Sequence, residues 1–325
     1  MHLVQVTDSL GIQYSYDMDV NIATADDGLA FYISQLASVE ARIYEVKYRN
    51  IVFMDFIPVD QSDPEWVDTV DYISYDAVTM GKFIAANGRD LPESDITASK
   101  STIPVGYGGN SYRYSLDELR KSQQTRIPVD VTKARMSFRG FQEHAQRVAF
   151  FGDSDRGMTG LFNNPNIPQD NSTLDYNTAT GAEIVADMNG LLIEIWQGSA
   201  EVHLPSVLLL PSDRYAVVSN RRMDTGTDTT VLQFFRENNL YTDMTSSPLT
   251  IRPNFELKTA NVAGTGGRMM AYELNEENLT MKMPLPWRPV APQPDGLTVK
   301  VPAEYKFGGV EFRYPGAARY RDFSS

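Results

Sequence analysis

The chain has no cysteine among its 325 residues. This absence excludes disulfide frameworks, thiolate nucleophiles and cysteine-based zinc sites. Hydrophobic residues make up 42% of the sequence and aromatic residues 11%, which is typical of an ordered protein. Stability must therefore come from buried apolar area and from contacts with other subunits.

A long apolar run is also missing. No stretch approaches the roughly 18 apolar residues that span a bilayer, so we expect no membrane partner. Residues 1–8 lack the basic flank and the apolar block of a signal peptide. We therefore expect the protein to be synthesised and first folded in the cytoplasm.

Positive charge is scarce. The 29 Lys and Arg residues are outnumbered by 42 Asp and Glu residues, and the formal net charge is −13. Such acidity keeps a protein soluble and argues against a general surface for phosphate groups. If the protein encloses nucleic acid, we expect no strong net attraction between the two.

Residues suited to catalysis are few. The three histidines are His2, His144 and His203. A Ser-His-Asp triad can be drawn on paper, but no Gly-x-Ser-x-Gly elbow accompanies it. His144 lies within a helical pattern, three positions before Arg147, and is predicted to be a surface or interface residue.

Loops that resemble ligand-binding motifs are incomplete. Asp153, Asp155 and Gly157 look like half of a calcium loop, but the further oxygen ligands and the closing Glu do not follow. Glycine clusters at 106–109 and 264–267 match neither a Walker loop nor a Rossmann turn. We predict turns at all three places. We predict no catalytic, cofactor-binding or metal-binding residues, no cofactor and no enzymatic activity.

The most informative feature that is present is a long amphipathic helix. Apolar residues recur every three or four positions, at Val131, Ala134, Phe138, Phe141, Ala145 and Val148. Pro128 suits the first turn of a helix, and Asp130 favours its N-terminal dipole. The pattern predicts about 24 helical residues, roughly 36 Å in length, that end at Gly152.

The pattern upstream of this helix is extended. β-type runs cover 51–57, 67–80 and 96–105, with a turn signal at Asn87-Gly88. We predict a projecting β-hairpin over 51–112, which is barely stable alone and should rest on another surface. Residues 1–25 are predicted to be an arm and residues 27–48 a helix.

The pattern downstream is mixed. Capping boxes begin helices at Ser115 and Thr180, and the second of these helices has an apolar stripe of Ile184, Met188, Leu191, Leu192, Ile195 and Trp196. The apolar run 207–210, between two prolines, predicts a strand buried on both faces. Further helices are predicted from Ser212 and over 229–238, and further strands over 250–257, 269–274, 279–283, 297–301 and 309–314. Proline is dense after residue 283, which is typical of edge strands and rigid turns.

Three motifs carry a resemblance to a known family. They are Tyr112-Arg-Tyr-Ser-Leu-Asp-Glu-Leu119, Ala149-Phe-Phe-Gly-Asp153 with Gly157-Met-Thr-Gly-Leu161, and Phe307-Gly-Gly-Val-Glu-Phe-Arg-Tyr-Pro315. In the order and spacing of these motifs, essentially the whole chain resembles the major capsid proteins of tailed bacteriophages. That family shares the α+β Hong Kong 97 fold.

The resemblance implies five parts of the chain. They are an N-terminal arm and helix (1–50), an extended β-hairpin loop (51–112), a peripheral domain with a long spine helix (113–177), an α/β axial domain (178–275), and peripheral strands with a C-terminal tail that returns to the axial domain (276–325). It also implies a structural protein of the virion whose pentamers and hexamers close into an icosahedral head around double-stranded DNA, without sequence-specific DNA binding. Copies are expected to contact each other through the arm and the loop, and portal, scaffolding and decoration proteins are the further expected partners.

Two features depart from some members of that family. Some members carry a long N-terminal scaffolding segment that is removed during maturation, whereas this chain starts at Met1 with a short arm. We therefore expect a separate scaffold or none. Some members join subunits by a Lys–Asn isopeptide bond; Lys82 and Lys100 lie in the corresponding region, but no partner Asn and catalytic acid can be identified, so this chemistry is not carried over.

Three alternatives stay open at this point. The nearest is the shell of a bacterial nanocompartment of the encapsulin type, because such shells use the same fold. A more distant one is an α/β enzyme whose catalytic lobe covers about residues 178–275. The third is a tail-tube or adhesin protein, which forms rods or trimers rather than closed shells.

Overall fold

The computed structural model describes residues 3–7, 13–17, 49–78, 95–118, 129–224, 226–262, 264 and 266–323. The chain divides into two compact units, Met1–Asn50 and Ile51–Ser325. In the first unit, strands β1 (Leu3–Thr7) and β2 (Gln13–Asp17) pair antiparallel in the predicted arm. The helix predicted over 27–48 and His2 lie outside the described residues.

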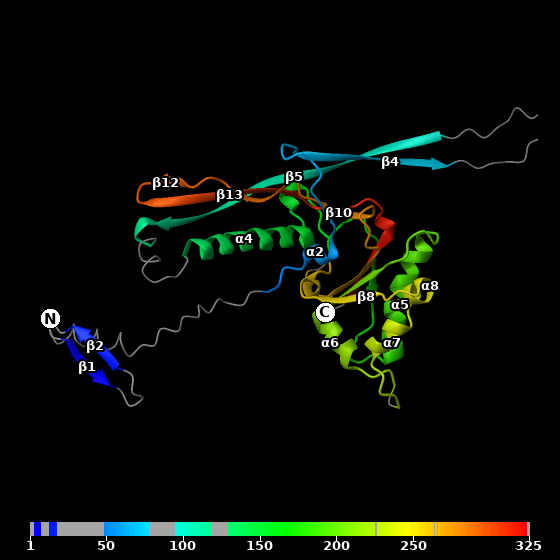
Figure 1. Ribbon diagram of the computed structural model, residues 1–325. Helices are drawn as coiled ribbons and strands as arrows, with labels where there is room; N and C mark the ends of the chain where they lie inside the picture. Colours follow the sequence, from blue (N-terminus) through cyan, green and yellow to red (C-terminus); the bar gives the residue numbers. More distant parts are fainter. Residues whose placement is uncertain are drawn as a thin grey trace, which may run out of the picture. The chain divides into compact units, whose positions relative to one another are not determined.

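The second unit contains a long sheet with the strand order β11-β13-β5-β4, and β12 also pairs with β13. Its strands are β4 (Thr69–Val78), β5 (Asp95–Ser115), β11 (Leu285–Pro289), β12 (Gln293–Asp295) and β13 (Thr298–Gly308). Strand β5 has two partners, because residues 95–104 pair with β4 and residues 105–115 pair with β13, both antiparallel. The antiparallel pairing predicted for the hairpin is present between 69–78 and 95–104, a shorter range than the predicted 51–112, and β5 continues into a sheet of its own subunit (Figure 1). Lys82 and the predicted turn at Asn87-Gly88 lie outside the described residues.

Residues 51–57 do not form the strand that their β-type pattern predicts. Phe53–Phe56 are the short helix α2, and the side chains of Phe53, Phe56 and Ile57 are buried. These three positions are spaced i, i+3 and i+4, which is one face of a helix, and a short apolar run does not distinguish this from a strand. Contact with the long helix decides the outcome, since Gln146 Oε1 accepts a hydrogen bond of 2.8 Å from Val52 N.

The glycines at 106–109 lie inside β5, so the turn predicted there is wrong. A Cβ atom on Gly108 would lie 2.4 Å from Cε2 of Tyr305, and one on Gly109 would lie 2.9 Å from the carbonyl oxygen of Ala303. The missing side chains therefore make room for β13 to approach closely. Where a turn is predicted at 264–267, Gly264 has a left-handed φ of +69° and its N–H donates to the carbonyl oxygen of Asn261 at 2.9 Å; residue 265 lies outside the described residues.

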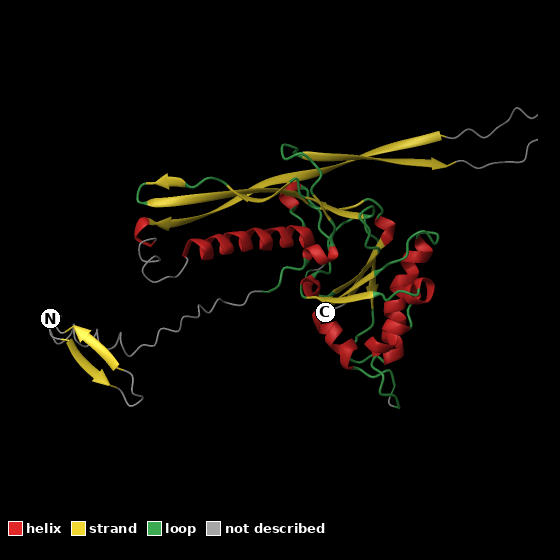
Figure 2. Cartoon of the chain, viewed as in Figure 1, coloured by secondary structure: helices red, strands yellow, loops and turns green. Residues whose placement is uncertain are grey.

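The predicted long helix is α4 (Val129–Phe151), which ends before Gly152 with φ of +68°. Figure 2 shows it running along the long sheet. The ring of Phe141 packs against Tyr305, with centroids 4.9 Å apart. Among the described side chains of the predicted apolar stripe, Phe141, Ala145 and Val148 are buried, whereas Phe138 is 41% exposed and lies edge-on to Trp287.

A polar turn follows α4, as predicted. The 3-10 helix η1 (Ser154–Arg156) begins after Asp153, whose Oδ1 accepts a hydrogen bond from Asp155 N at 3.1 Å. Gly157 ends it with φ of +69°. Both aspartates are thus accounted for by the local turn.

A second sheet has the order β6-β15-β9-β7-β8. Its strands are β6 (Gln169–Ser172), β7 (Val207–Pro211), β8 (Thr250–Asn254), β9 (Arg268–Tyr272) and β15 (Ala318–Phe323). Strand β7 is buried along its whole length, as predicted: Leu208 and Leu210 enter one core cluster, and Val207 and Leu209 enter the other. The sheet therefore separates a core shared with α4 from a core shared with α5.

Helices cover the second of these cores. They are α5 (Gly181–Gly198), α6 (Ser212–Asn220), α7 (Val231–Glu237) and α8 (Leu240–Thr245). Two 3-10 helices flank strands of the sheet in the sequence: η2 (Glu256–Thr259) follows β8, and η3 (Pro315–Ala317) precedes β15. The predicted capping box of α5 is present, because Thr180 and Glu183 bond to each other's backbone N–H. Its predicted stripe is buried except at Trp196, which is partly exposed. Helix α8 has no counterpart among the predictions.

The second unit also contains a small third sheet. It has the order β14-β10-β3, with β3 (Val59–Asp60), β10 (Leu279–Lys282) and β14 (Val310–Phe312). Strand β3 is parallel to β10 and leads toward β4. Among the helices of the described residues, none combines the length and hydropathy that a membrane span requires.

Candidate functional site

Each of the two described histidines contacts one polar side chain. Nδ1 of His144, on α4, lies 2.8 Å from the hydroxyl of Tyr305, and Nδ1 of His203 lies 2.8 Å from Oε2 of Glu273. Burial lowers the pKa of His144, and the positive charges of Arg156 and Arg147 add to this effect against the opposing charge of Asp153. Ser199 Oγ contacts His203 only through its backbone. These contacts are those of packed side chains rather than of a triad.

Acidic and histidine side chains are not grouped for metal binding either. In the part of the chain that the structure describes, no three of them lie close enough together to hold a metal ion. A hollow of about 460 Å³ beside the turn after α4 is lined by His144, Arg147 and Asp155, among others. His144 is the one histidine among its lining residues, and Ser154 of the turn is the one serine.

The candidate functional site is therefore a surface rather than a pocket. We call β4 together with residues 95–104 of β5 the ribbon. Among the described strands, β4 pairs with β5 alone, so the ribbon is only two strands wide. Asp71 joins the two strands, since its carboxylate accepts a hydrogen bond of 2.5 Å from Thr102 Oγ1 and lies 2.8 Å from Lys100 Nζ. Lys100, one of the two lysines singled out in the sequence, is thus paired within its own subunit.

Four acidic residues before β4 are held by three basic residues of other strands. We call this set the root clamp: Asp60, Asp63, Glu65 and Asp68 with Lys282, Arg288 and Lys306. The residues between β3 and β4 are thereby tied to β10, β11 and β13. The clamp lies directly before the start of the ribbon.

The two lysines of the root clamp are the buried part of it. Lys282 Nζ lies 2.5 Å from Asp60 Oδ2 and 3.0 Å from Asp63 Oδ2, and its side chain is 9% exposed. Lys306 Nζ lies 2.7 Å from Asp68 Oδ1 with a side chain 6% exposed. The hydrogen bond from Lys282, with help from Ser62, lowers the pKa of Asp60 to about 2. Burial lowers the pKa of Lys282, but the hydrogen bond to Asp60 and the nearby carboxylate of Asp63 outweigh it, so the net shift is upward.

Arg288 forms the exposed part of the clamp. Its guanidinium lies 3.1 Å from both carboxylate oxygens of Glu65 and 2.8 Å from Glu304 Oε1. Glu304 also accepts a hydrogen bond of 2.9 Å from the hydroxyl of Tyr107. Exposed pairs of this kind contribute little stability, whereas loss of a partner from a buried lysine leaves an uncompensated charge. The lysines should therefore dominate the strength of the clamp.

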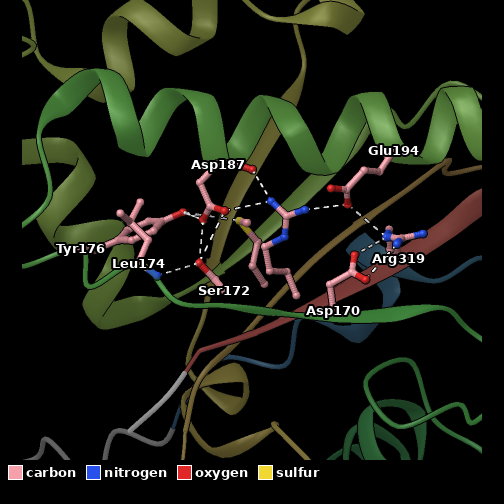
Figure 3. A network of polar contacts seen from close by, with 9 residues as sticks. Asp170, Ser172, Leu174, Tyr176, Asp187, Glu194 and Arg319 are labelled. Atoms are coloured by element: carbon pink, nitrogen blue, oxygen red, sulfur yellow. Dashed lines mark hydrogen bonds and ion pairs between the residues drawn. The ribbon is translucent and has the colours of Figure 1, made fainter.

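A second charged network holds the C-terminal strand in the α/β lobe (Figure 3). Arg321 of β15 donates to Asp187 at 2.8 Å and to Glu194 at 2.6 Å, both on α5. Arg319 lies 2.5 Å from Asp170 of β6 and 3.1 Å from Glu194. The hydrogen bond from Arg319 lowers the pKa of Asp170. Tyr176 and Ser172 complete the network by donating to Asp187.

Sequence reasoning found neither the clamp nor the network. The signals were present in the sequence. Arg319 and Arg321 are two positions apart and therefore lie on the same face of a strand, and Asp187 and Glu194 are two helical turns apart. However, the partners lie more than 100 positions away in sequence, and periodicity does not pair them. Only the sheet register brings them together.

Comparisons with known proteins agree on one group. Residues 80–323 match the family described as "Major capsid protein". Among solved structures, the chain is similar to the capsid of Myoviridae phage XM1, with a TM-score of 0.75 and 14% identity over 90% of this chain and 98% of that one. Mycobacterium phage Ogopogo gives a TM-score of 0.57 and 14% identity over 90% and 98%. A virus-like particle from Pyrococcus furiosus gives 0.52 and 12% over 82% and 91%. No curated protein matches.

The structural likeness shows the fold and its extent. These relatives are matched over at least 91% of their own length, so the chain contains nearly the whole fold. The chain therefore has the mixed α+β fold of phage capsid proteins that its motifs predict. At 12–14% identity the likeness carries no residue roles.

Proposed function

Because this chain belongs to the major capsid protein family, we propose that its copies form pentamers and hexamers that close into an icosahedral phage head around double-stranded DNA. It is a structural protein of the virion capsid, and it assembles with itself into the shell. The observation that carries the finer proposal is β5, which is half ribbon and half sheet of its own subunit. A two-stranded ribbon is barely stable alone in water. Neighbouring subunits offer the surface on which it can rest.

We assign the parts of the chain accordingly. Residues 1–50 form the arm, 51–112 the extended loop, 113–177 the peripheral domain with α4 as spine helix, 178–275 the axial domain, and 276–325 the remaining peripheral strands and the tail. Residues 53–60 are an exception within the second range, since α2 and β3 pack on α4 and β10. Strand β15 supports the last part, because it pairs with β9 in the sheet of the α/β lobe.

Contacts between copies would add many modest interfaces. Apolar area removed from water contributes roughly 25 cal/mol per Å², and closed symmetry repeats each contact around the shell. We infer that the role is structural rather than catalytic, that assembly occurs in the host cytoplasm, and that portal, scaffolding and decoration proteins are further partners. DNA would be enclosed without base-specific contacts, and the net charge of −13 favours the absence of a strong net attraction between shell and DNA.

Shortening the segment that joins the two strands of the ribbon tests the proposal. Val78 lies directly opposite Asp95, so residues 79–94 can be replaced by Asn-Gly, which closes a two-residue hairpin turn. We expect a folded subunit, by circular dichroism and thermal unfolding, that elutes as small oligomers and forms no closed shells in negative-stain micrographs. Closed shells of normal size and yield from this variant would contradict the proposal.

The shell of a protein-filled compartment is the second candidate, because the likeness to a virus-like particle from Pyrococcus furiosus fits a closed shell of either kind. The contents of purified particles separate the two candidates. Nuclease-protected DNA supports the phage head, and a co-purified cargo enzyme without DNA supports the compartment.

A further inference from the structure

Glu311 is a buried carboxylate that no contact described so far uses. It lies on β14, is 7% exposed, and has no hydrogen-bond partner for either carboxylate oxygen. The nearest cation is Arg313, directly after the end of β14, whose Nε lies 3.9 Å from Oε2. That distance is too long for a hydrogen bond. An ionised carboxylate in such a place is costly, and a neutral one is not.

The position of Glu311 connects it to the root clamp. Thr280 on β10 is its cross-strand partner. Because side chains alternate along a strand, Lys282 projects from β10 on the same face as Thr280. Lys282 is shared already, since Asp60 of β3 and Asp63 of the following loop hold its Nζ. The charged groups around Glu311 are thus Arg313, Lys282 and, through Lys282, these two aspartates.

The structure also leaves room for movement at this junction. A hollow of about 330 Å³ lies between β14 and the base of the ribbon, lined by Tyr72, Ser101, Pro104 and Glu311 among others. Small shifts of the ribbon base can therefore occur without breaking the cores on either side of the second sheet.

We propose that Glu311 is a proton-controlled competitor for Lys282, so that the root clamp is closed when Glu311 is neutral and loosened when it is ionised. With the proton bound, Lys282 serves Asp60 and Asp63 alone, and the start of the ribbon is held. When the proton leaves, Glu311 becomes a buried anion without a donor. Attraction of Lys282 toward Glu311 then withdraws the ammonium group from Asp60 and Asp63.

The pH range of this device follows from the groups involved. Burial raises the pKa of Glu311 from 4.5 to about 7, although Arg313 and Lys282 oppose this. Asp60, with a pKa of about 2, keeps its charge throughout the neutral range and does not contribute a change there. The native state therefore retains a proton between about pH 4.5 and 7 that a locally opened state releases, so opening becomes easier as pH rises through this range. The inference concerns the isolated subunit and goes beyond the proposed assembly.

Hydrogen exchange of the full-length, unassembled subunit tests the device. Protection factors of peptides covering 59–72 are measured between pH 5 and pH 9, corrected for intrinsic exchange rates. We expect protection to fall with rising pH in the wild type, by at most about 300-fold, which corresponds to the difference between 4.5 and about 7. Glu311→Gln, which has no proton to lose, should keep the low-pH protection at all pH values.

Two controls make the outcome decisive. Glu277→Gln changes an exposed carboxyl of the loop before β10 and should keep the wild-type pH dependence. Lys282→Met should give low, pH-independent protection, because the clamp has lost its shared cation. An unchanged pH dependence in Glu311→Gln, or in Lys282→Met, would overturn the proposal.

A measurement on the wild type covers the case in which Glu311→Gln fails to fold. The Glu311 carboxyl can be followed by carbon NMR of selectively labelled protein. Titration near pH 7 supports the device, and titration near 4.5 refutes it. Neither result depends on whether the subunit forms shells.

Discussion

The buried ion pair of Arg268 and Asp322 gives a quantitative test of how the C-terminal strand is held. Arg268, on β9, is 3% exposed, and Asp322, on β15, is 5% exposed. The guanidinium donates to both carboxylate oxygens of Asp322, at 2.6 and 2.9 Å, and also to the carbonyl oxygen of Phe162. Its central carbon lies 4.3 Å from the ring centroid of Tyr320. The pair thus joins β9, β15 and the loop after α4.

Asp322→Asn removes the negative charge and keeps the shape. Arg268 then stays buried with its charge uncompensated, which costs about 3–5 kcal/mol of unfolding free energy. For a unit of this length, such a loss lowers the midpoint of thermal unfolding by roughly 5–8 °C. Replacement of both residues, as Arg268→Met with Asp322→Leu, removes the stranded charge and should cost much less than the single change.

Calorimetry and urea unfolding of the unassembled subunit measure these differences. Asp228→Asn is the matched control, because its pair with Arg222 is 3.7 Å long and both side chains are exposed; we expect a change within about 0.5 kcal/mol. A loss below about 1 kcal/mol for Asp322→Asn would refute the reasoning, since water or a rearranged partner would then be satisfying Arg268. A double variant as unstable as the single one would show that packing, not charge, is responsible.

Two further predictions concern the long and the second sheet. Gly108→Ala places a Cβ atom 2.4 Å from the Tyr305 ring, which is confined by Phe141 and Phe307, so we expect a loss of about 1–3 kcal/mol by urea unfolding; Gly316→Ala, which meets no atom within 4 Å, should be nearly neutral. Leu208→Ala opens a cavity beside a completely buried strand and should cost about 2–5 kcal/mol. Leu297→Ala, at a side chain that is 78% exposed, should change stability little, and equal losses for the two leucines would contradict the placement of the core.

Local sequence patterns were sufficient where local physics decides the structure. The three-to-four-residue period predicted α4 within two residues at each end, and the Thr180 capping box began α5 at the residue expected. The apolar run 207–210 identified a central strand, because only a strand covered on both faces can hide four consecutive large side chains. The absence of cysteine and the acidic charge balance also excluded whole classes of site without any structure.

Patterns failed where the partner lies far away in the chain. Residues 53–56 form a helical turn because α4 offers a surface to Phe53 and Phe56, although their composition suits a strand equally well. The glycines at 106–109 suggested a turn, but Tyr305 and the backbone of β13 occupy the space that side chains would fill. The ammonium group of Lys282 donates a hydrogen bond to the carboxylate of Asp60, which lies 222 positions away in the sequence. No sequence period encodes that pairing.

By itself, the sequence determined the long helix, the capped helix and the buried central strand, which of their faces are apolar, and to which family the motifs point. The tertiary structure alone decided that β5 serves two partners, that a clamp of buried lysines holds the start of the ribbon, and that Glu311 has no donor. The physical reason is the range of the forces involved. Backbone periodicity and capping act within a few residues, whereas ion pairs, close backbone approach and desolvation depend on chain segments that only folding brings together.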